Sequence, residues 1–383
     1  MSDEKAIVGF IGAGGIARSH AYSLNSLRYF YNDAPEVLAA AVCSATDVSR
    51  MSFANRFGFA KAYNLEEFLA DKEINTVFIL GPNKVHYEHL KAVCEMSSIR
   101  RIYLEKPVCS GLEEEKAIAV LSRKYSGIRI QVGFQYLFSS AVREALSFWK
   151  SGKLGTPIHF EIKYYHSDYL IKEYRDKRTS RLTPAPDGGA MADLGSHAIS
   201  LLIAFIGDNL HITSAIQAGS FEDVPDGSDL FSLISLYDKS SGASGTLAAS
   251  RISSGTGDSL SIGLFATKGA LSYTSDRADY FEYFTEEAGL WNRKVVGSNY
   301  RPVTSFPSGH VPGGWLRSMI HAQYVFLKGT NTETFIPGIE HGLAVQRLVT
   351  QTAEYLERFR ELKSRKNTPW NSVFKNKRKA ENI

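Results

Sequence analysis

The chain has 383 residues, of which 44% are hydrophobic and 22% charged, as in an ordinary globular protein that buries a sizeable core. Its net charge of +4 is concentrated at the carboxyl end, where residues 363–383 contribute +6 and leave −2 for the rest, which argues against a nucleic-acid-binding surface. No apolar run reaches the 18 residues of a membrane-spanning helix, and the amino terminus lacks a secretory signal, so we expect a cytoplasmic protein without membrane contact.

The first third of the chain alternates apolar strands with amphipathic helices. The predicted strands are short apolar runs, and they cover residues 6–11, 37–43, 76–80, 101–104 and 128–134. The predicted helices between them cover residues 16–27, 48–57, 85–95 and 112–125. Strands that alternate with helices predict βαβ units, and hence a doubly wound parallel sheet of the Rossmann type.

The pattern changes near Gln135. After a helix over residues 141–150, strand-like stretches with period-two alternation cover residues 158–166, 230–237, 245–251 and 260–266. Short polar links join the last three, which predicts an antiparallel sheet. Helices over residues 189–206, 315–327 and 341–362 are expected to cover one face of it. We therefore predict an α/β protein of two domains, a dinucleotide-binding domain over residues 1–135 and an α/β domain over residues 136–383 that ends in a basic tail.

A glycine-rich turn follows the first predicted strand. Residues 12–17 read Gly-Ala-Gly-Gly-Ile-Ala and fit the pattern G-x-G-x-x-A between a strand and a helix. Gly12 permits the tight turn, Gly14 lets the backbone approach a pyrophosphate, and Ala17 allows close packing of helix on strand. Gly15 and Ile16 begin the helix, whose free N–H groups attract phosphate. The alternative is a turn whose glycines serve packing only.

The end of the second predicted strand bears on the choice of cofactor. An NAD-preferring site usually has an acidic residue there, which binds the ribose hydroxyls. This chain has Ser44 at that position and Arg50 soon after it, a combination suited to a 2′-phosphate. The sequence therefore favours NADP over NAD. Asp47 is the competing candidate, because it serves as the acid if the strand continues that far.

Three polar side chains suggest the chemistry of the site. Lys106 follows a strand end and precedes Pro107, and a lysine there can stabilise the developing alkoxide of a substrate. Asp193 and His197 are one turn apart on a predicted helix, so that His197 can act as general base while Asp193 orients it. The plain alternatives are a surface lysine, a capping aspartate and a core histidine. No third ligand accompanies the pair, so no metal is predicted.

Four segments together resemble the glucose-fructose oxidoreductase / inositol dehydrogenase / MocA (Gfo/Idh/MocA) family. They are residues 12–17, residues 81–86 (Gly-Pro-Asn-Lys-Val-His), residues 105–107 (Glu-Lys-Pro) and residues 188–197 (Gly-Gly-Ala-Met-Ala-Asp-Leu-Gly-Ser-His), in an order that spans almost the whole chain. The resemblance implies a Rossmann domain followed by a domain with an open antiparallel sheet. That sheet commonly joins subunits in the family, which implies a homodimer or homotetramer.

The resemblance also implies roles for individual residues. Lys106 matches the family's active-site lysine, and Asp193 and His197 match its aspartate and histidine. Lys106 therefore belongs to the catalytic, cofactor-binding and substrate-binding sets. The segment with Pro82, Asn83 and His86 matches residues close to the cofactor, and Glu105 lies along the nicotinamide. One departure is the sequence Gln-Tyr-Leu-Phe at residues 135–138, where members often have Asn-Arg-Phe.

Aromatic and basic residues of the second half are candidates for the substrate pocket. Tyr164, Tyr165 and His166 end a predicted strand, and aromatic rings stack well on sugar faces, although such residues more often pack a core. The basic segment 174–181 is a candidate for selecting a phosphorylated or nucleotide-linked sugar, with a solvated loop as the alternative.

The favoured function is hydride transfer between NAD(P) and a secondary alcohol or ketone of a sugar, a sugar derivative or an inositol. Two alternatives stay open. One is a redox-assisted glycosidase or lyase that retains its cofactor, and the other is an NAD(P)-sensing regulator without turnover. Lys106, Asp193 and His197 together favour catalysis, whereas the basic tail is the feature that suggests a protein partner.

Overall fold

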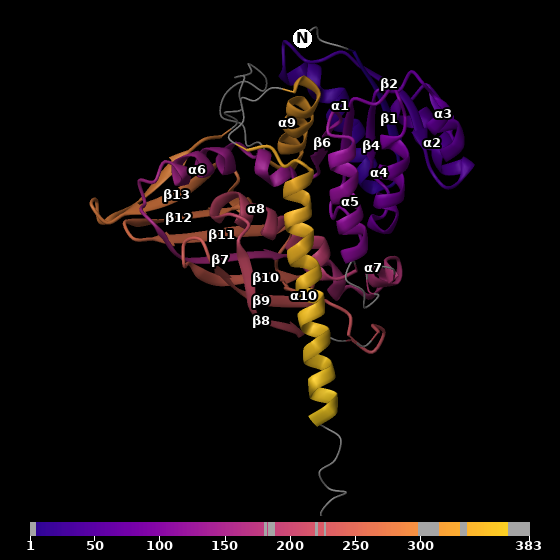
Figure 1. Ribbon diagram of the computed structural model, residues 1–383. Helices are drawn as coiled ribbons and strands as arrows, with labels where there is room; N and C mark the ends of the chain where they lie inside the picture. The colour runs from indigo at the N-terminus through magenta and orange to yellow at the C-terminus, as the bar shows by residue number, and fades with distance from the viewer. Residues whose placement is uncertain are drawn as a thin grey trace, which may run out of the picture.

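The computed structural model describes residues 5–179, 182, 188–218, 221–225, 227–297, 314–329 and 335–366, the last eight by backbone only. Two β-sheets with their helices make up this part of the chain, and the long helix α10 (Ile339–Lys366) runs between them (Figure 1). None of the helices in the described ranges is long and apolar enough to cross a membrane. The predicted basic tail lies outside them from residue 367 onward.

The first sheet has six parallel strands in the order β3-β2-β1-β4-β5-β6. Helices flank it, and its central strands are buried, because in a parallel sheet both faces are covered. The strands are β1 (Ala6–Ile11), β2 (Val37–Cys43), β3 (Lys61–Tyr63), β4 (Thr76–Ile79), β5 (Arg101–Leu104) and β6 (Arg129–Val132). The helices are α1 (Gly15–Phe30), α2 (Asp47–Phe57), α3 (Leu65–Ala70), α4 (His86–Cys94), α5 (Leu112–Lys124) and the 3₁₀ turn η1 (Asn83–Val85).

The second sheet has eight strands in the order β14-β13-β12-β11-β7-β10-β9-β8. All neighbours are antiparallel except β7 and β10, which run parallel. The strands are β7 (Pro157–Tyr165), β8 (Leu210–Ala218), β9 (Phe231–Asp238), β10 (Ser244–Ser250), β11 (Ser259–Ala266), β12 (Gly269–Thr274), β13 (Tyr280–Thr285) and β14 (Leu290–Val295). The predicted fold class is thus confirmed, whereas the domain boundary at residue 135 stays a prediction.

The remaining helical segments connect the sheets or cover the second one. In chain order they are η2 (Gln135–Phe138), α6 (Ser140–Lys150), η3 (Asp168–Leu170), α7 (Lys172–Asp176), η5 (Met191–Gly195), α8 (Ser196–Ile206), η6 (Ser275–Arg277), α9 (Gly314–Lys328) and α10. The predicted helix over residues 189–206 is thus a turn of π-helix, η5, followed by α8.

Helix α9 does not cover the second sheet, which corrects the prediction. It packs against α1 of the first domain instead (Figure 1). The ring of Tyr31 stacks on Tyr324 at 3.8 Å, and the Tyr31 hydroxyl lies 2.7 Å from His321 Nδ1. Helix α10 contacts α8 and β8 on one side and α5 and β6 on the other, so it holds the two sheets together.

Candidate active site

The candidate residues of the first domain gather at one edge of its sheet. The glycine turn follows β1, Pro82 and Asn83 follow β4, and Glu105 and Lys106 follow β5. All these strands run parallel, so their carboxyl ends meet at the same edge. Ligands of open parallel sheets bind at this edge, close to the point where the strand order reverses between β1 and β4.

The glycine turn has the shape that a pyrophosphate requires. Gly12 has a φ of +123°, and a Cβ there would lie 2.8 Å from the Leu80 carbonyl carbon, so this position demands glycine. A Cβ on Gly14 or Gly15 would meet no protein atom within 4 Å. Gly14 caps α1 without a side-chain hydrogen bond, which leaves the first N–H groups of the helix available to an anion. Ile16 is half-buried and Ala17 fully buried, consistent with close packing of α1 on the sheet.

Ser44 directly follows β2, and its side chain is partly accessible. Arg50 donates to the Ser44 carbonyl oxygen at 3.3 Å and forms an ion pair with Asp47. Asp47 is the first residue of α2 and is largely exposed, so the strand does not continue to it. The condition under which Asp47 would replace the acidic residue of an NAD site is therefore not met.

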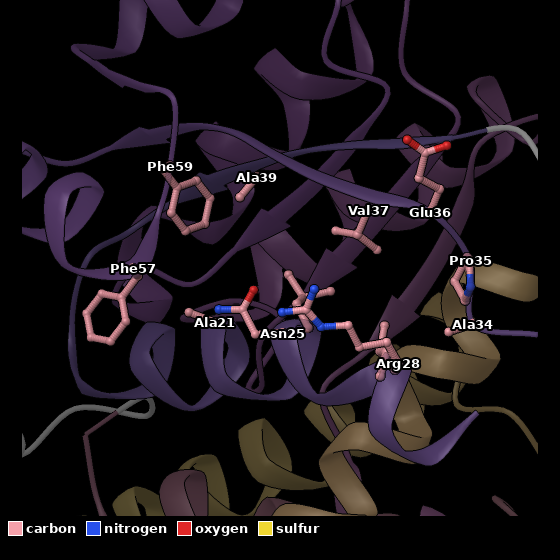
Figure 2. A pocket seen from close by; sticks show the side chains of 12 residues that line it. Ala21, Asn25, Arg28, Ala34, Pro35, Glu36, Val37, Ala39, Phe57 and Phe59 are labelled. Atoms are coloured by element: carbon pink, nitrogen blue, oxygen red, sulfur yellow. The ribbon is translucent and has the colours of Figure 1, made fainter. Parts of the chain in front are cut away.

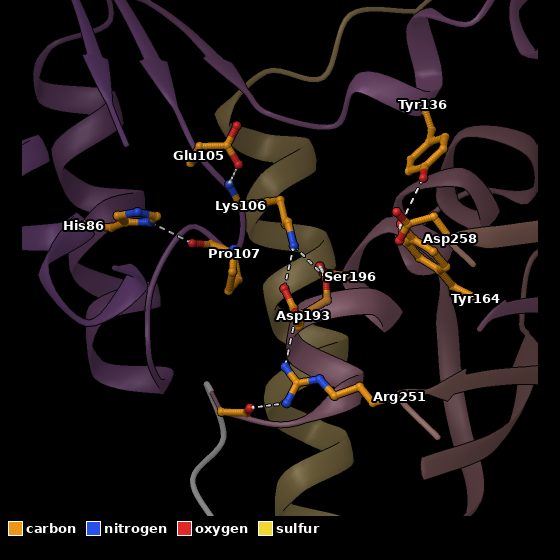
Figure 3. Close-up of polar contacts among 11 residues, drawn as sticks. His86, Glu105, Lys106, Pro107, Tyr136, Tyr164, Asp193, Ser196, Arg251 and Asp258 are labelled. Carbon is orange, nitrogen blue, oxygen red and sulfur yellow. Dashed lines mark hydrogen bonds and ion pairs between the residues drawn. The ribbon is translucent and has the colours of Figure 1, made fainter. Parts of the chain in front are cut away.

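His86 holds two loops of this edge together. Its Nδ1 lies 2.8 Å from the Pro107 carbonyl oxygen (Figure 3), and its Nε2 lies 2.9 Å from that of Gly81. The ring is buried, and burial lowers the pKa of His86 although both carbonyl groups favour the charged form. His86 thereby ties the loop after β4 to the loop that carries Lys106.

Glu105 takes part in a buried hydrogen-bond network that the sequence did not reveal. Its Oε1 lies 2.9 Å from His20 Nε2, and its Oε2 accepts from the Lys106 backbone N–H at 3.2 Å. On the far side of the ring, Gln323 Nε2 donates to His20 Nδ1 at 2.8 Å. Because Nδ1 is the acceptor, the proton of a neutral His20 lies on Nε2 and is donated to Glu105. Helices α1 and α9 together thus fix the carboxylate beside Lys106.

The structure brings Lys106 and Asp193 together. Lys106 Nζ donates to the Asp193 carbonyl oxygen at 2.7 Å and to its Oδ1 at 3.0 Å. Arg251, at the end of β10, donates to Asp193 Oδ2 at 3.0 Å and to the Gly188 carbonyl oxygen at 3.1 Å. Figure 3 shows the two cations on opposite sides of the carboxylate. Arg251 is fully buried, while Lys106 and Asp193 keep 14% and 17% of their side-chain surface exposed. Asp193 therefore links the two domains and lies between two positive charges.

His197 lies in an aromatic pocket beside this array. Its ring centroid lies 5.3 Å from that of Tyr136, 5.9 Å from Tyr164 and 6.0 Å from Phe134. Burial, together with the nearby Lys106 ammonium, holds the pKa of His197 well below its usual value of 6.5, so the ring is neutral near pH 7. Its Nδ1 is buried and has no hydrogen-bond partner among the described residues. A neutral imidazole has one ring nitrogen with a free lone pair and can therefore act as a proton acceptor.

The aromatic residues at the end of β7 divide between the two faces of the sheet. Tyr164 is buried next to His197 and donates to Asp258 Oδ1 at 3.1 Å. Tyr165 points to the opposite face, where the Lys163 ammonium lies 5.5 Å from its ring centroid. The alternation of side chains along a strand causes this, so Tyr164 rather than Tyr165 faces His197, and the assignment of Tyr165 to the substrate pocket stays a prediction. His166 is buried, burial lowers its pKa, and its backbone N–H donates at 2.9 Å to the carbonyl oxygen of Ser250, the residue before Arg251.

Comparison with known proteins identifies the family. Residues 7–134 match the profile of the Gfo/Idh/MocA oxidoreductase family with an NAD-binding Rossmann fold, and residues 142–272 match the profile of the Gfo/Idh/MocA carboxyl-terminal domain. The chain belongs to this family. The resemblance inferred from the four sequence segments is thereby confirmed, and with it the NAD-binding character of the first domain.

Several relatives within the Gfo/Idh/MocA family have named activities. Glucose-6-phosphate 3-dehydrogenase of Bacillus subtilis is 26% identical over 55% of this chain, and the match spans little more than half, 56%, of that protein. Levoglucosan dehydrogenase of Pseudarthrobacter phenanthrenivorans is 23% identical over 71% of this chain and 74% of its own length. A scyllo-inositol 2-dehydrogenase (NAD(+)) of Bacillus subtilis is 34% identical over 25% of this chain and 27% of its own.

Solved structures of the family share the fold over nearly their whole length. Levoglucosan dehydrogenase in complex with NADH and levoglucosan superimposes with a TM-score of 0.81, at 19% identity, over 93% of this chain and 98% of that one. An inositol dehydrogenase homologue from Azotobacter vinelandii, in complex with NAD+, gives a TM-score of 0.77 at 16% identity, over 92% of this chain and 96% of that one. These likenesses establish the arrangement of both sheets in this family member.

Cavity size alone does not locate the site. A cavity of about 410 Å³ lies between α1, the start of β2 and the residues Phe57 and Phe59 (Figure 2). It faces the amino-terminal part of β2, away from the edge that carries Lys106, and none of the candidate residues lines it. The chemistry at the carboxyl edge, rather than this larger cavity, therefore defines the candidate active site.

Proposed function

We propose that this chain is an NAD(P)-dependent dehydrogenase that interconverts a secondary alcohol and a ketone of a sugar, a sugar derivative or an inositol. One observation carries the proposal. Asp193 joins Lys106 and Arg251 beside the neutral His197, at the edge where the glycine turn offers free N–H groups. The named activities of its relatives, all dehydrogenases, point in the same direction.

The cofactor is assigned to the carboxyl edge of the first sheet. The open space at Gly14 and Gly15 fits the pyrophosphate, and Ser44 fits the adenosine ribose. When bound, the nicotinamide supplies the acceptor for the hydride of the carbinol carbon. NADP is favoured, because Ser44 replaces the acidic residue of an NAD site and Arg50 lies beside it. The residues assigned to the cofactor are Gly12, Gly14, Gly15, Ile16, Ala17, Ser44, Arg50, Pro82, Asn83, His86, Glu105 and Lys106.

The chain's own residues handle the proton and the charge. His197, neutral at pH 7, accepts the hydroxyl proton of the substrate, and Lys106 donates a hydrogen bond to the oxygen as negative charge develops on it. Asp193 orients Lys106, and Arg251 in turn holds Asp193. Tyr164 and His166 form walls of the substrate pocket. In the reverse direction, the protonated His197 returns its proton to the carbonyl oxygen.

The test is reduction of NAD+ or NADP+, followed by the absorbance of the reduced nicotinamide, with a panel of inositols, monosaccharides and sugar phosphates. We expect one class of polyol to give turnover. The variant Lys106→Ala should lower kcat by about 10²–10³-fold, as for loss of a hydrogen bond to an oxyanion. Lys91→Ala, an exposed lysine on α4, is the matched control and should retain full activity. Full activity in Lys106→Ala would contradict the assignment.

The two other functions predict different results. A glycosidase or lyase that retains its cofactor releases product without accumulating reduced nicotinamide. A regulator binds cofactor but turns over no polyol. If no polyol of the panel reduces the cofactor, while cofactor binding is still detectable by fluorescence, one of these two functions is favoured.

We further infer that the protein is a cytoplasmic homodimer or homotetramer. Large apolar side chains are exposed on the outer face of the second sheet, namely Ile216, Tyr237, Phe265 and Trp291. Ile216, Tyr237 and Phe265 alternate with the buried residues of their strands, so they lie on the face that the helices leave uncovered. Trp291 lies on the same face, because the strand pairing aligns Phe265 with Ala270, Ala270 with Phe284 and Phe284 with Trp291. Light scattering on the purified protein measures the mass directly, and a monomer at micromolar concentration would contradict the inference.

A further inference from the structure

A second cavity adjoins the candidate active site. It has a volume of about 210 Å³ and lies among η2, η6, the turn before β11 and the first turn of α9. Tyr136, Asp258, Tyr273, Asp276 and Trp315 contribute most of its functional groups. The same Tyr136 contacts the ring of His197, and the same Asp258 bonds to Tyr164. The cavity is therefore one aromatic ring away from the proposed general base.

A hydrogen-bond chain connects residues of the cavity with Tyr164, which lies next to His197 (Figure 3). Tyr164 donates to Asp258, whose carboxylate only accepts, so the Tyr136 hydroxyl donates to Tyr164 across 2.9 Å. Both tyrosines are buried, while Asp258 is exposed. This chain fixes the orientation of Tyr136, which lines the cavity and also contacts the ring of His197.

The lining of the cavity combines aromatic rings with hydrogen-bond acceptors. Tyr136, Tyr273 and Trp315 supply the rings. Asp258 accepts from Tyr164 through Oδ1, and Asp276 accepts from Ser259 through Oδ2 at 2.6 Å, so each carboxylate has a second oxygen for another donor. An aromatic ring packs on the C–H face of a sugar, and a carboxylate accepts from its hydroxyls. The described lining therefore matches a polyhydroxylated ring.

The charge of the cavity is opposite to what a phosphate requires. Its described lining contains two carboxylates and no lysine or arginine, so a phosphate there would be repelled. Arg175, in the basic segment 174–181, does not supply a compensating charge. Arg175 is buried and donates to both oxygens of Asp223, at 2.9 Å and 3.0 Å. The acidic residues beside the site thus select against anionic sugars.

We propose that this cavity is a second saccharide subsite, and that the preferred substrate is an uncharged disaccharide or glycoside. Its reacting ring lies at Lys106 and His197, and the neighbouring ring lies on Tyr136, Tyr273 and Trp315. The proposal rests on the proposed function, because it names the substrate class of the same site. It excludes sugar phosphates and nucleotide-linked sugars as the preferred substrates.

The test compares kcat/KM for monosaccharides, their neutral glycosides and disaccharides, and the corresponding phosphates. We expect the best neutral disaccharide to exceed its parent monosaccharide by about tenfold or more, the equivalent of one well-made contact. Ala278→Trp fills the cavity from η6 and should remove that gain while it leaves the monosaccharide rate unchanged. Ala278→Ser is the matched control with no added bulk. Asp276→Asn keeps the shape of the cavity and should reduce the gain several-fold.

The outcomes separate this proposal from the proposed function. If monosaccharides reduce the cofactor but neutral glycosides give no gain, or a phosphate gives the higher kcat/KM, the subsite is wrong and the dehydrogenase stands. If Ala278→Trp lowers the rates of both substrate types equally, the subsite is also wrong. If no sugar reduces the cofactor, the proposed function fails. Calorimetry on the cofactor-loaded protein then decides the subsite, since binding of a disaccharide to wild type but not to Ala278→Trp supports it and no binding overturns it.

Discussion

Replacement of Arg251 by methionine is the most informative perturbation of the array. Met retains much of the volume and the flexibility of the side chain but removes the guanidinium. In wild type that group donates to Asp193 Oδ2 at 3.0 Å and to the Gly188 carbonyl oxygen at 3.1 Å, and it packs over the ring of Tyr169 at 4.6 Å. The variant leaves the carboxylate with the Lys106 ammonium as its remaining charged partner in the described array.

The size of the effect follows from burial. Removal of one partner from a buried ion pair costs about 3–5 kcal/mol, since it leaves an uncompensated charge. Asp193 keeps Lys106 and is 17% exposed, so we expect the lower end, about 3 kcal/mol of apparent unfolding free energy. Arg293→Met is the matched control. Arg293 donates to Glu282 at the similar distance of 2.9 Å but is 51% exposed, and we expect its loss to cost less than about 1 kcal/mol.

Urea unfolding of the two variants, followed by circular dichroism, measures the difference directly. Reduction of the cofactor is a second readout. Arg251 holds Asp193, which orients Lys106, so the Arg251→Met variant should lose activity. The Arg293→Met variant should stay active. Equal unfolding free energies for the two variants, within 1 kcal/mol of each other, would refute the argument that burial makes the Arg251–Asp193 pair important.

Three further predictions concern other parts of the molecule. Gly14→Val should fold normally, because its Cβ meets no protein atom, but it should lose cofactor affinity. Gly12→Ala should lower the melting temperature, because φ is positive there and the Cβ would meet Leu80. The reverse pattern in calorimetry would contradict the assignment of the turn. Arg50→Ala should lower kcat/KM for NADP by about tenfold and leave NAD unchanged, whereas equal losses for the two cofactors would count against a 2′-phosphate site. His341 is buried, and burial lowers its pKa from 6.5 to about 4, so its contribution to stability is full above pH 6.5 and is lost as the pH falls toward 4. At about 1.4 kcal/mol per pH unit, the pKa shift of His341 corresponds to about 3 kcal/mol of unfolding free energy. The variant His341→Gln should therefore make the unfolding free energy depend less steeply on pH between 6.5 and 4. An unchanged slope would contradict the burial argument.

The elements that could be predicted from the sequence are those that bury apolar runs. Strands β1, β2, β4 and β5 are surrounded by helices, so their positions stand out as short apolar segments. Strand β3 has three residues, all half-buried, and carries no such signal. The four strands β8, β12, β13 and β14 were also missed, since buried and more accessible positions do not alternate regularly along them.

Amphipathic pattern predicted helix α9 but not the surface on which it packs. Nearly all of its side chains from Arg317 to Leu327 are buried, including polar ones. Gln323 and His321 find partners on α1, about 300 residues earlier in the chain. Such contacts between polar groups far apart in sequence leave no local pattern, so the docking of α9 could not be predicted from its own residues.

The residues of the candidate site also fall into those that local sequence motifs predict and those that only the structure reveals. Lys106, Asp193 and His197 lie in local motifs and could be selected from the sequence. Arg251 appears there only as a charged residue at the end of an alternating strand, and its partner Asp193 is 58 residues away. The choice between Tyr164 and Tyr165 depends on which face of β7 turns inward. That is decided by the packing of the sheet and not by the identity of two adjacent tyrosines.

Isotope transfer tests the central claim most directly. A sugar that turns over would be deuterated at its carbinol carbons and incubated with the protein and NAD+ or NADP+, and the cofactor would be analysed by mass spectrometry. The account predicts that reduced cofactor accumulates with one deuterium per molecule, and that His197→Gln abolishes this transfer while still binding cofactor. Cleavage of the sugar without any accumulation of labelled, reduced cofactor would contradict the account.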